Sequence, residues 1–326
     1  MIEILGLILP LFGLILLGYI AARLVHQPIE ALGWLNVFVV YLALPALFFR
    51  LLSKTPVEKL ASWDFIVTNV GVTFVVFALT FVLGFVTTRR QVAQATIQGL
   101  AGAYGNIGYM GPALAILALG ETAAVPVALI FCFENVMHFV VAPTMMTISG
   151  RQTASLLRLL LEIARRIACH PFIIATAAGV GAAFMDFVPP APVERLIDYL
   201  AKAAAPCALF AMGVTLALRP LTRVPGALLY IVPMKLVLHP AAMYLALSYA
   251  GAFDPTWVFT AVLLASLPTA TNVFVLAQQY GVWIEQASAS VLVTTVLSVL
   301  SVSLLLYAIS TGLLPADVFP ATANGD

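Results

Sequence analysis

Two short stretches of this sequence place polar side chains beside residues that break helices. The stretch GNIGYMGP contains Asn106, Gly108, Tyr109, Gly111 and Pro112. The stretch LPTATN contains Pro268, Thr269, Thr271 and Asn272. Glycine weakens a helix, and proline removes a backbone donor and clashes with the preceding turn. Each stretch therefore predicts a helix break, where the positive end of the following half-helix and nearby amide and hydroxyl groups could bind a small anion.

Four ionisable side chains lie inside apolar segments, where such groups are functional candidates by default: Glu134, His138, Lys202 and Lys235. Glu134 and His138 are four residues apart and share one helical face. Three interpretations stay open. Glu134 can form a structural pair with His138 or a lysine, Glu134 or His138 can carry the coupling proton, and Lys235 can bind a substrate carboxylate. Lys202 lies near the end of its segment and can instead snorkel to water.

Neither stretch, nor the group of intramembrane charges, predicts an enzyme or a metal site. Glu134 and His138 would supply two ligands, which is too few for a metal ion. The chain has no GxSxG, HExxH or paired intramembrane aspartate motif. No catalytic residue and no cofactor are therefore expected, and an intramembrane enzyme is only a remote alternative.

The composition is that of a membrane protein. Hydrophobic residues make up 63% of the chain, charged residues 9%, and the mean hydropathy is +1.08. Because soluble domains carry roughly 25% charged residues, a soluble protein is excluded. The net charge of +1 gives no reason to expect a nucleic-acid partner. The sequence has three scattered cysteines, Cys132, Cys169 and Cys207. Their spacing predicts neither a disulfide framework nor a zinc site.

The apolar runs predict an all-α integral membrane protein with ten transmembrane helices, since one crossing takes about 20 apolar residues. The predicted spans are 3–25, 33–52, 63–87, 94–118, 122–147, 170–188, 196–218, 226–250, 256–279 and 286–314. The connections are short. The longest, residues 149–169, spaces leucines and arginines as in an amphipathic helix on the cytoplasmic membrane surface.

The loop cations predict the orientation in the cell inner membrane. Nine lie on one side, at Arg23, Arg89, Arg90, Arg151, Arg158, Arg165, Arg166, Arg219 and Arg223. Four lie on the other side, at Arg50, Lys54, Lys59 and Arg195. Because cytoplasmic loops carry the excess of Lys and Arg, both termini are expected on the extracytoplasmic side.

An offset of 161 residues aligns helix breakers in the two halves of the chain. It pairs Pro10 with Pro171, Pro28 with Pro189, Pro45 with Pro206, and Gly18 with Gly179. The halves are residues 1–148 and 170–314, followed by a short tail at 315–326. Five spans per half give an inverted repeat, the architecture of many secondary transporters. Small residues can also simply allow close helix packing, but two corresponding breaks, in spans 4 and 9, favour a substrate site.

At these breaks the sequence resembles a known family. GNIGYMGPALAILALGE and LPTATNVFVLAQQYG resemble the helix 4 and helix 9 signatures of the auxin efflux carrier family, bacterial branch, and the resemblance covers the whole chain. It implies the fold of bile-acid/sodium symporters, with a scaffold of helices 1, 2, 6 and 7 that commonly forms homodimers. It also implies a mobile core of helices 3–5 and 8–10. Broken helices 4 and 9 would cross at the midplane, where organic anions bind.

The resemblance transfers specific residues and also has limits. Asn106 and the Gly108–Pro112 turn match the helix 4 crossing, and Pro268 to Asn272 match the helix 9 crossing. Gly111 and Pro112 are adjacent, whereas many relatives have one more residue between them. Val273 stands where plant carriers have a second proline. The long cytosolic loop of many plant members is absent, so their phosphorylation control is not transferred.

The sequence therefore predicts a secondary active transporter of a small organic anion, such as malonate, another carboxylate or an auxin-like weak acid. Alternating access of the core against the scaffold would be driven by protons or by the membrane potential. The main alternative is a sodium-coupled organic anion symporter, since Asn, Thr and backbone carbonyl oxygens at the crossing could hold Na⁺. A passive channel is a further alternative. The lipid bilayer is the other expected partner.

Overall fold

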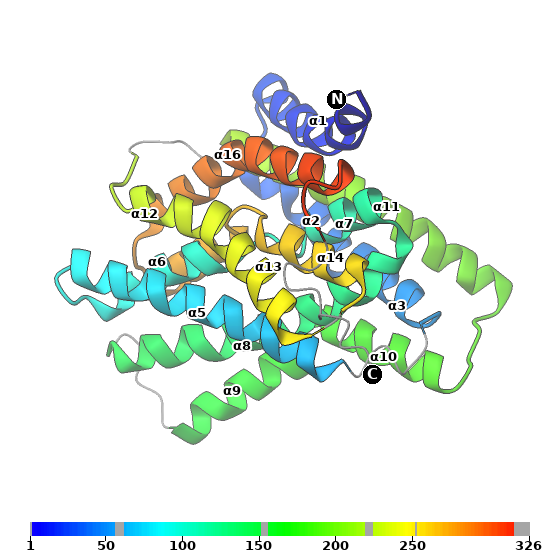
Figure 1. Ribbon diagram of the computed structural model, residues 1–326, viewed down its shortest axis with the longest axis horizontal. Coiled ribbons are helices and arrows are strands. Elements are labelled where there is room, and N and C mark those ends of the chain that lie inside the picture. Colours follow the sequence, from blue (N-terminus) through cyan, green and yellow to red (C-terminus); the bar gives the residue numbers. More distant parts are fainter. Residues whose placement is uncertain (1, 56–61, 151–155, 219–223, 252, 316–326) are drawn as a thin grey trace, which may run out of the picture. The chain divides into compact units, whose positions relative to one another are not determined.

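The computed structural model describes residues 2–55, 62–150, 156–218, 224–251 and 253–315. All of the secondary-structure elements named in this part of the chain are helices (Figure 1). Six helical stretches there are long and apolar enough to cross a membrane: Ile29–Leu52, Trp63–Thr87, Glu121–Ile148, Ala191–Leu218, Leu228–Ala250 and Ile284–Ser310. Shorter apolar helices cover Leu9–Val25, Pro171–Phe184 and Pro255–Ala265. The chain is thus an all-helical membrane protein with several apolar helices, and the full set of ten crossings stays a prediction.

Several residues used for the orientation and the domain boundaries lie outside the described part of the chain. They are Lys59, Arg151, Arg219, Arg223 and tail residues 316–326.

The chain forms two compact units. Unit 1 comprises Met1–Ala61, Gly108–Cys132 and Ser155–Pro220. Its helices are α1 Ile2–Val25, η1 Ile29–Leu32, α2 Gly33–Val37, η2 Phe38–Ala43, α3 Leu44–Leu52, α7 Gly111–Leu119, η3 Glu121–Ala123, α9 Leu156–Ala168, α10 Pro171–Phe184 and α11 Ala191–Leu218.

Unit 2 comprises Ser62–Ile107, Phe133–Ala154 and Leu221–Asp326. Its helices are α5 Trp63–Thr87, α6 Val92–Ala103, α12 Leu228–Pro233, η4 Met234–Leu238, α13 His239–Ala250, α14 Pro255–Ala265, α15 Thr271–Tyr280 and α16 Ile284–Ser310. Helix α8, Ala124–Ile148, contributes to both units.

Both spans that carry the polar breaker stretches are interrupted. Helix α6 ends at Ala103 and α7 begins at Gly111, while α14 ends at Ala265 and α15 begins at Thr271. Pro112 occupies the first turn of α7. Backbone N–H groups in the first turn have no partner within the helix, so proline costs no helical hydrogen bond there. Under the 161-residue offset, residues 104–110 correspond to 265–271, so the two interruptions fall at equivalent positions.

The closest helix packing in unit 1 also follows this offset. Helix α1 packs on α11, and α10 packs on α3. A Cβ atom on Gly18 of α1 would collide with the carbonyl group of Phe210 on α11, and one on Gly179 of α10 would lie 3.2 Å from the carbonyl oxygen of Phe49 on α3. Gly18 corresponds to Gly179, and Phe49 corresponds to Phe210. The same small-residue contact thus occurs twice, with the roles of the halves exchanged.

Unit 2 has its core around α5 and α6. Helix α5 packs against α6 and α13 (Figure 1). Helix α6 also packs against α15 and α16. The buried apolar side chains of this core include Phe77, Ile97, Leu100 and Val273 on these helices, and Met146 on α8. This packing brings α6, which precedes the first break, together with α15, which follows the second break.

The interval predicted to be an amphipathic connector contains α9. Leu157, Leu160 and Leu161 are exposed, whereas Ile163 is buried. Its place on a membrane surface stays a prediction.

Candidate functional site

The two helix breaks are joined by backbone hydrogen bonds within unit 2. The Asn106 N–H donates to the Pro268 carbonyl oxygen at 2.8 Å, and the Ala270 N–H donates to the Tyr104 carbonyl oxygen at 2.9 Å. Gly105 and Thr269 thereby form a single antiparallel bridge. Backbone groups that a broken helix leaves uncovered are costly in hydrocarbon. The backbone groups at each break therefore hydrogen-bond with backbone groups of the other break. We name residues 104–106 and 268–270 the break junction.

The side chain of Thr269 holds the break junction to the neighbouring helices. Its hydroxyl donates to the Ala101 carbonyl oxygen at 2.7 Å, and its N–H donates to the Thr294 hydroxyl at 3.1 Å. Asn106, Pro268 and Thr269 are buried. Thr271 is half-buried and Asn272 is exposed, both in the first turn of α15. Of the residues predicted in span 9, Asn272 is thus the most accessible.

Tyr104 connects the break junction to α8. Its hydroxyl accepts a hydrogen bond from Asn272 at 2.8 Å and donates to Asn135 Oδ1 at 2.5 Å. Its ring stacks on His138, with ring centroids 3.8 Å apart and an interplanar angle of 10°. Neither Tyr104 nor Asn135 was predicted from the sequence. The sequence signal that could have found them is their position beside predicted site residues, since Tyr104 lies two residues before Asn106 and Asn135 follows Glu134.

Replacement of Tyr104 by phenylalanine should lower the stability of the protein without removing the ring stack. The change removes the hydroxyl that donates to Asn135 Oδ1 and accepts from Asn272, and the loss of such a buried hydrogen-bonding group costs about 1–3 kcal/mol. The thermal unfolding midpoint in detergent measures this loss. Tyr249→Phe, at an exposed side chain, is the matched control and should leave the midpoint unchanged. Equal midpoints for the two variants would contradict the bridging role of the hydroxyl.

A chain of four buried side chains joins Lys235 to Glu134. Lys235 Nζ lies 3.1 Å from His239 Nδ1, His239 Nε2 lies 3.2 Å from the Thr73 hydroxyl, and that hydroxyl donates to Glu134 Oε1 at 2.9 Å. An ammonium group can only donate, so His239 Nδ1 accepts and Nε2 carries the hydrogen. All donors therefore point from the ammonium group towards the carboxylate. We call these residues the Lys235–Glu134 chain.

Two members of the Lys235–Glu134 chain, His239 and Thr73, were not predicted from the sequence. His239 lies four residues after Lys235 and shares its helical face, a signal that was available. Thr73 had no such signal, because its partners lie 61 and 166 residues away in sequence.

His138 does not pair with the Glu134 carboxylate. Its Nδ1 lies 2.6 Å from the Glu134 backbone carbonyl oxygen, which can only accept, so Nδ1 carries the hydrogen. Among the described residues His138 Nε2 is buried without a hydrogen-bond partner. This nitrogen therefore keeps a lone pair that could accept a proton.

The remaining predicted residues of span 4 belong to unit 1. Gly111 and Pro112 are buried at the start of α7, and Gly108 and Tyr109 are half-buried before it. A Cβ atom on Gly108 would lie 3.0 Å from the ring of Phe131, so this glycine allows close packing.

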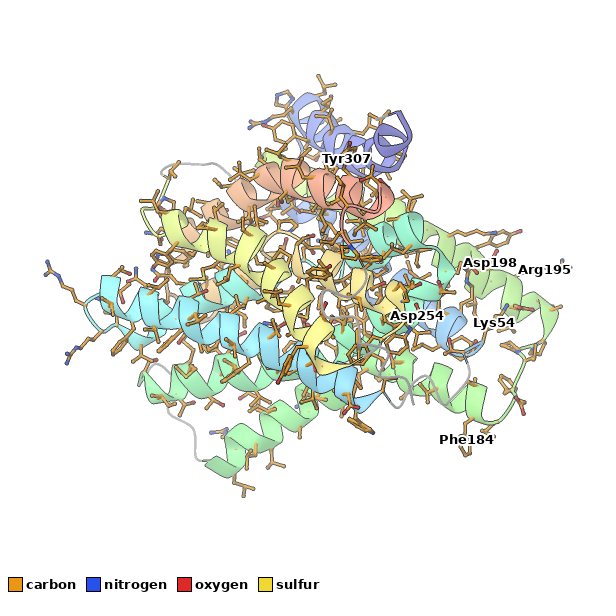
Figure 2. All side chains as sticks on the ribbon, viewed as in Figure 1. Lys54, Phe184, Arg195, Asp198, Asp254 and Tyr307 are labelled. Atoms are coloured by element: carbon orange, nitrogen blue, oxygen red, sulfur yellow. The ribbon has the colours of Figure 1, made fainter. Side chains whose placement is uncertain are left out.

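Lys202 belongs to an ion-pair cluster in unit 1. Its ammonium group lies 2.6 Å from Asp198 Oδ2, and its side chain is 68% exposed. Arg50 contacts the other Asp198 oxygen at 2.5 Å, and Lys54 pairs with Glu194 at 2.9 Å. Figure 2 labels Lys54 and Asp198 at this end of the unit. Lys202 is thus an exposed member of an ion-pair cluster, and snorkelling to the membrane surface stays a prediction.

Comparison with known proteins identifies the family. A family model described as "Membrane transport protein" matches residues 3–306. The chain belongs to this family. It is the auxin efflux carrier family that the two motifs resemble, so that resemblance is confirmed. Membership of the membrane transport protein family makes the chain a membrane transporter and not an enzyme.

Relatives in the membrane transport protein family extend over nearly the whole chain. A protein of Rhizobium meliloti (strain 1021) named "Putative malonate transporter" is 69% identical over 320 residues, 98% of this chain and 100% of the relative. "Uncharacterized transporter YfdV" of Escherichia coli (strain K12) is 24% identical and covers 93% of this chain and 96% of its own length. An "Uncharacterized transporter" of Methanothermobacter thermautotrophicus is 25% identical, covering 91% and 95% respectively.

Proposed function

We propose that this membrane transporter is a secondary active carrier of a small organic anion, with malonate or a related carboxylate as its substrate. The observation that carries the proposal is the break junction. Its hydrogen bonds between Asn106 and Pro268 and between Ala270 and Tyr104 bring together the polar residues of two interrupted spans. Secondary transporters place their substrate and ion sites at such discontinuous helices.

The start of α15 supplies the preference for an anion. The N-terminus of a helix carries a partial positive charge and unpaired N–H groups. Thr271 and Asn272 occupy this first turn, and Asn272 is exposed. A carboxylate bound there would accept from the backbone and from the Asn272 amide. The name of the R. meliloti relative supports malonate as the first substrate to test.

We also propose an inverted repeat and alternating access for this carrier, in the cell inner membrane with both termini on the extracytoplasmic side. The equivalent Gly18–Phe210 and Gly179–Phe49 contacts support the repeat, because a two-fold relation between the halves generates one contact from the other. The two interruptions at equivalent positions support it independently. Inverted repeats are a frequent basis of alternating access.

Glu134 and His138 are the proposed coupling residues. Glu134 accepts a hydrogen bond from the Thr73 hydroxyl, and His138 keeps a buried acceptor nitrogen beside Tyr104. Tyr104 in turn bonds Asn272. The Tyr104 side chain therefore connects His138 on α8 with Asn272 in the first turn of α15, and a change in protonation at His138 can act on that turn through it. This connection favours proton coupling over a purely structural role.

The test is transport of labelled malonate by the purified protein in proteoliposomes. We expect saturable counterflow, and acceleration by an imposed proton gradient or membrane potential. Absence of saturable uptake for malonate and for a panel of other carboxylates would overturn the proposal. Acceleration by a sodium gradient alone would replace proton coupling by the sodium-coupled alternative.

Asn106→Ala should reduce malonate uptake at least about tenfold, the loss expected when one substrate hydrogen bond is removed. The backbone bond from Asn106 to Pro268 does not need the side chain, so the fold should survive. Asn69→Ala removes another buried asparagine of unit 2, which contacts the sulfur of Met243, and should keep uptake within about twofold. Uptake that is lost equally in both variants would point to general destabilisation.

A further inference from the structure

The ammonium group of Lys235 lies at the C-terminal end of a half-helix. Lys235 is 0% exposed, and its Nζ donates to the carbonyl oxygen of Ala265, the last residue of α14, at 2.5 Å. Gly105 of the break junction leaves room for this contact. A Cβ atom there would lie 3.2 Å from Nζ and 3.2 Å from the carbonyl oxygen of Leu264. The charge is thus held between the end of α14 and the break in span 4.

Backbone geometry places Lys235 at this position. It lies in a π-helical turn, Met234–Leu238, flanked by Pro233 and Pro240. Proline removes a helical donor and displaces the preceding turn, and single π-helical turns occur frequently at functional sites. The turn directs a buried lysine towards the end of α14.

The end of α14 is an environment for a cation. The last carbonyl groups of a helix lack helical partners and carry a partial negative charge. In transporters with discontinuous helices, such half-helix ends and unwound carbonyls coordinate Na⁺ or H⁺. Glu134 is joined to Lys235 through Thr73 and His239, and its carboxyl group can supply the counter-charge. The site therefore already contains a basic side chain at the half-helix end and an acidic side chain connected to it.

We propose that the Lys235 ammonium group is a built-in cation, which fills the position at the end of α14 where a sodium-coupled carrier would bind Na⁺. The inference rests on the proposed function in treating the break junction as the transport site. The carrier then needs no dissociable cation there. Removal of the lysine side chain should open a site that an added cation can occupy.

The experiment measures ion-dependent thermal unfolding of the purified full chain in detergent, at constant ionic strength in choline chloride. The probes are propylammonium chloride, sodium chloride and uncharged 1-propanol. Lys235→Ala should gain about 3 °C or more with propylammonium or sodium and less with 1-propanol. The wild type and Lys235→Met, which fills the space without charge, should show no ion-specific gain.

Three outcomes would overturn the assignment. One is a folded Lys235→Ala protein that responds to no cation, or that responds to 1-propanol as strongly as to propylammonium. Another is the same response in Leu236→Ala, a neighbouring buried truncation. The third is sodium-specific stabilisation of the wild type, which decides the question even if Lys235→Ala does not fold. No substrate is used, so absence of malonate transport with a positive ion response would refute only the proposed function.

Discussion

Glu134→Gln should lower the free energy of unfolding by about 3–5 kcal/mol, the cost of leaving one member of a buried charge pair uncompensated. Glu134 is 3% exposed and Lys235 is 0% exposed. The Lys235–Glu134 chain has neutral members between the two charges. Loss of the carboxylate therefore leaves the ammonium group with dipolar partners, the Ala265 carbonyl oxygen and His239 Nδ1.

The double variant Glu134→Gln with Lys235→Met should recover much of this loss, because it contains neither charge. The interaction energy from the double-mutant cycle should reach about 2–3 kcal/mol, at the upper end of the usual range. Chemical unfolding in detergent measures the four proteins of the cycle. Additive losses would show that the two charges do not stabilise each other.

The exposed pair Lys54–Glu194 is the matched control for this cycle. Its side chains are 66% and 43% exposed, and such pairs contribute about 0–1 kcal/mol. The cycle Lys54→Met with Glu194→Gln should therefore give a small interaction energy that falls further with added salt. A large, salt-independent value there would mean that the assay does not report local pairing.

Gly213→Ala should be the most destabilising single-methyl change in unit 1, with a loss of about 3 kcal/mol, the upper end for overpacked sites. Its Cβ atom would collide with the Ile15 carbonyl oxygen and lie 2.9 Å from the Tyr19 nitrogen. Both are backbone atoms of α1, so no rotamer change relieves the collision and the helices must separate. The unfolding midpoint and the elution profile in detergent measure the effect.

Gly13→Ala on α1 provides the control, since its Cβ atom would have no neighbour within 4 Å. This change should be neutral or slightly stabilising, because alanine favours the helix. Gly179→Ala should fall between the two, since its nearest neighbours lie at 3.0–3.2 Å. Gly18→Ala with Gly213→Ala should cost less than the sum of the single changes, because both widen the same gap. An equal effect at Gly13 and Gly213 would contradict this account.

The interruptions of spans 4 and 9 could be predicted because their causes are local. Gly108, Gly111, Pro112 and Pro268 act on the turn in which they lie. The extension of the seventh span to Ala191 and the π-helical turn at Met234–Leu238 were not predicted. Apolar periodicity contains neither, because the first turn of α11 carries the charged residue Glu194 and the π-helical turn lies between Pro233 and Pro240.

The polar partners around the breaks were only partly accessible from sequence. Helical spacing connects Glu134 with His138 and could have connected Lys235 with His239, because i and i+4 positions share a face. A side-chain pair of Glu134 with His138 was one of the alternatives left open, and the imidazole bonds the Glu134 backbone carbonyl oxygen instead. Thr73, Tyr104 and Thr294 join helices that are far apart in sequence, and such contacts cannot be predicted from the spacing of residues in a single sequence.

The two equivalent glycine contacts of unit 1 have a consequence for biogenesis. Helices α1 and α3 are synthesised early, but their closest partners, α11 and α10, belong to the second half of the chain. The early helices must therefore insert into the bilayer with their contact faces against lipid. Translation has to pass Leu218 before both contacts can close. The early helices of the nascent transporter thus depend on later ones for their packing, and a ribosome stalled before α10 would leave both faces available to the membrane quality-control machinery.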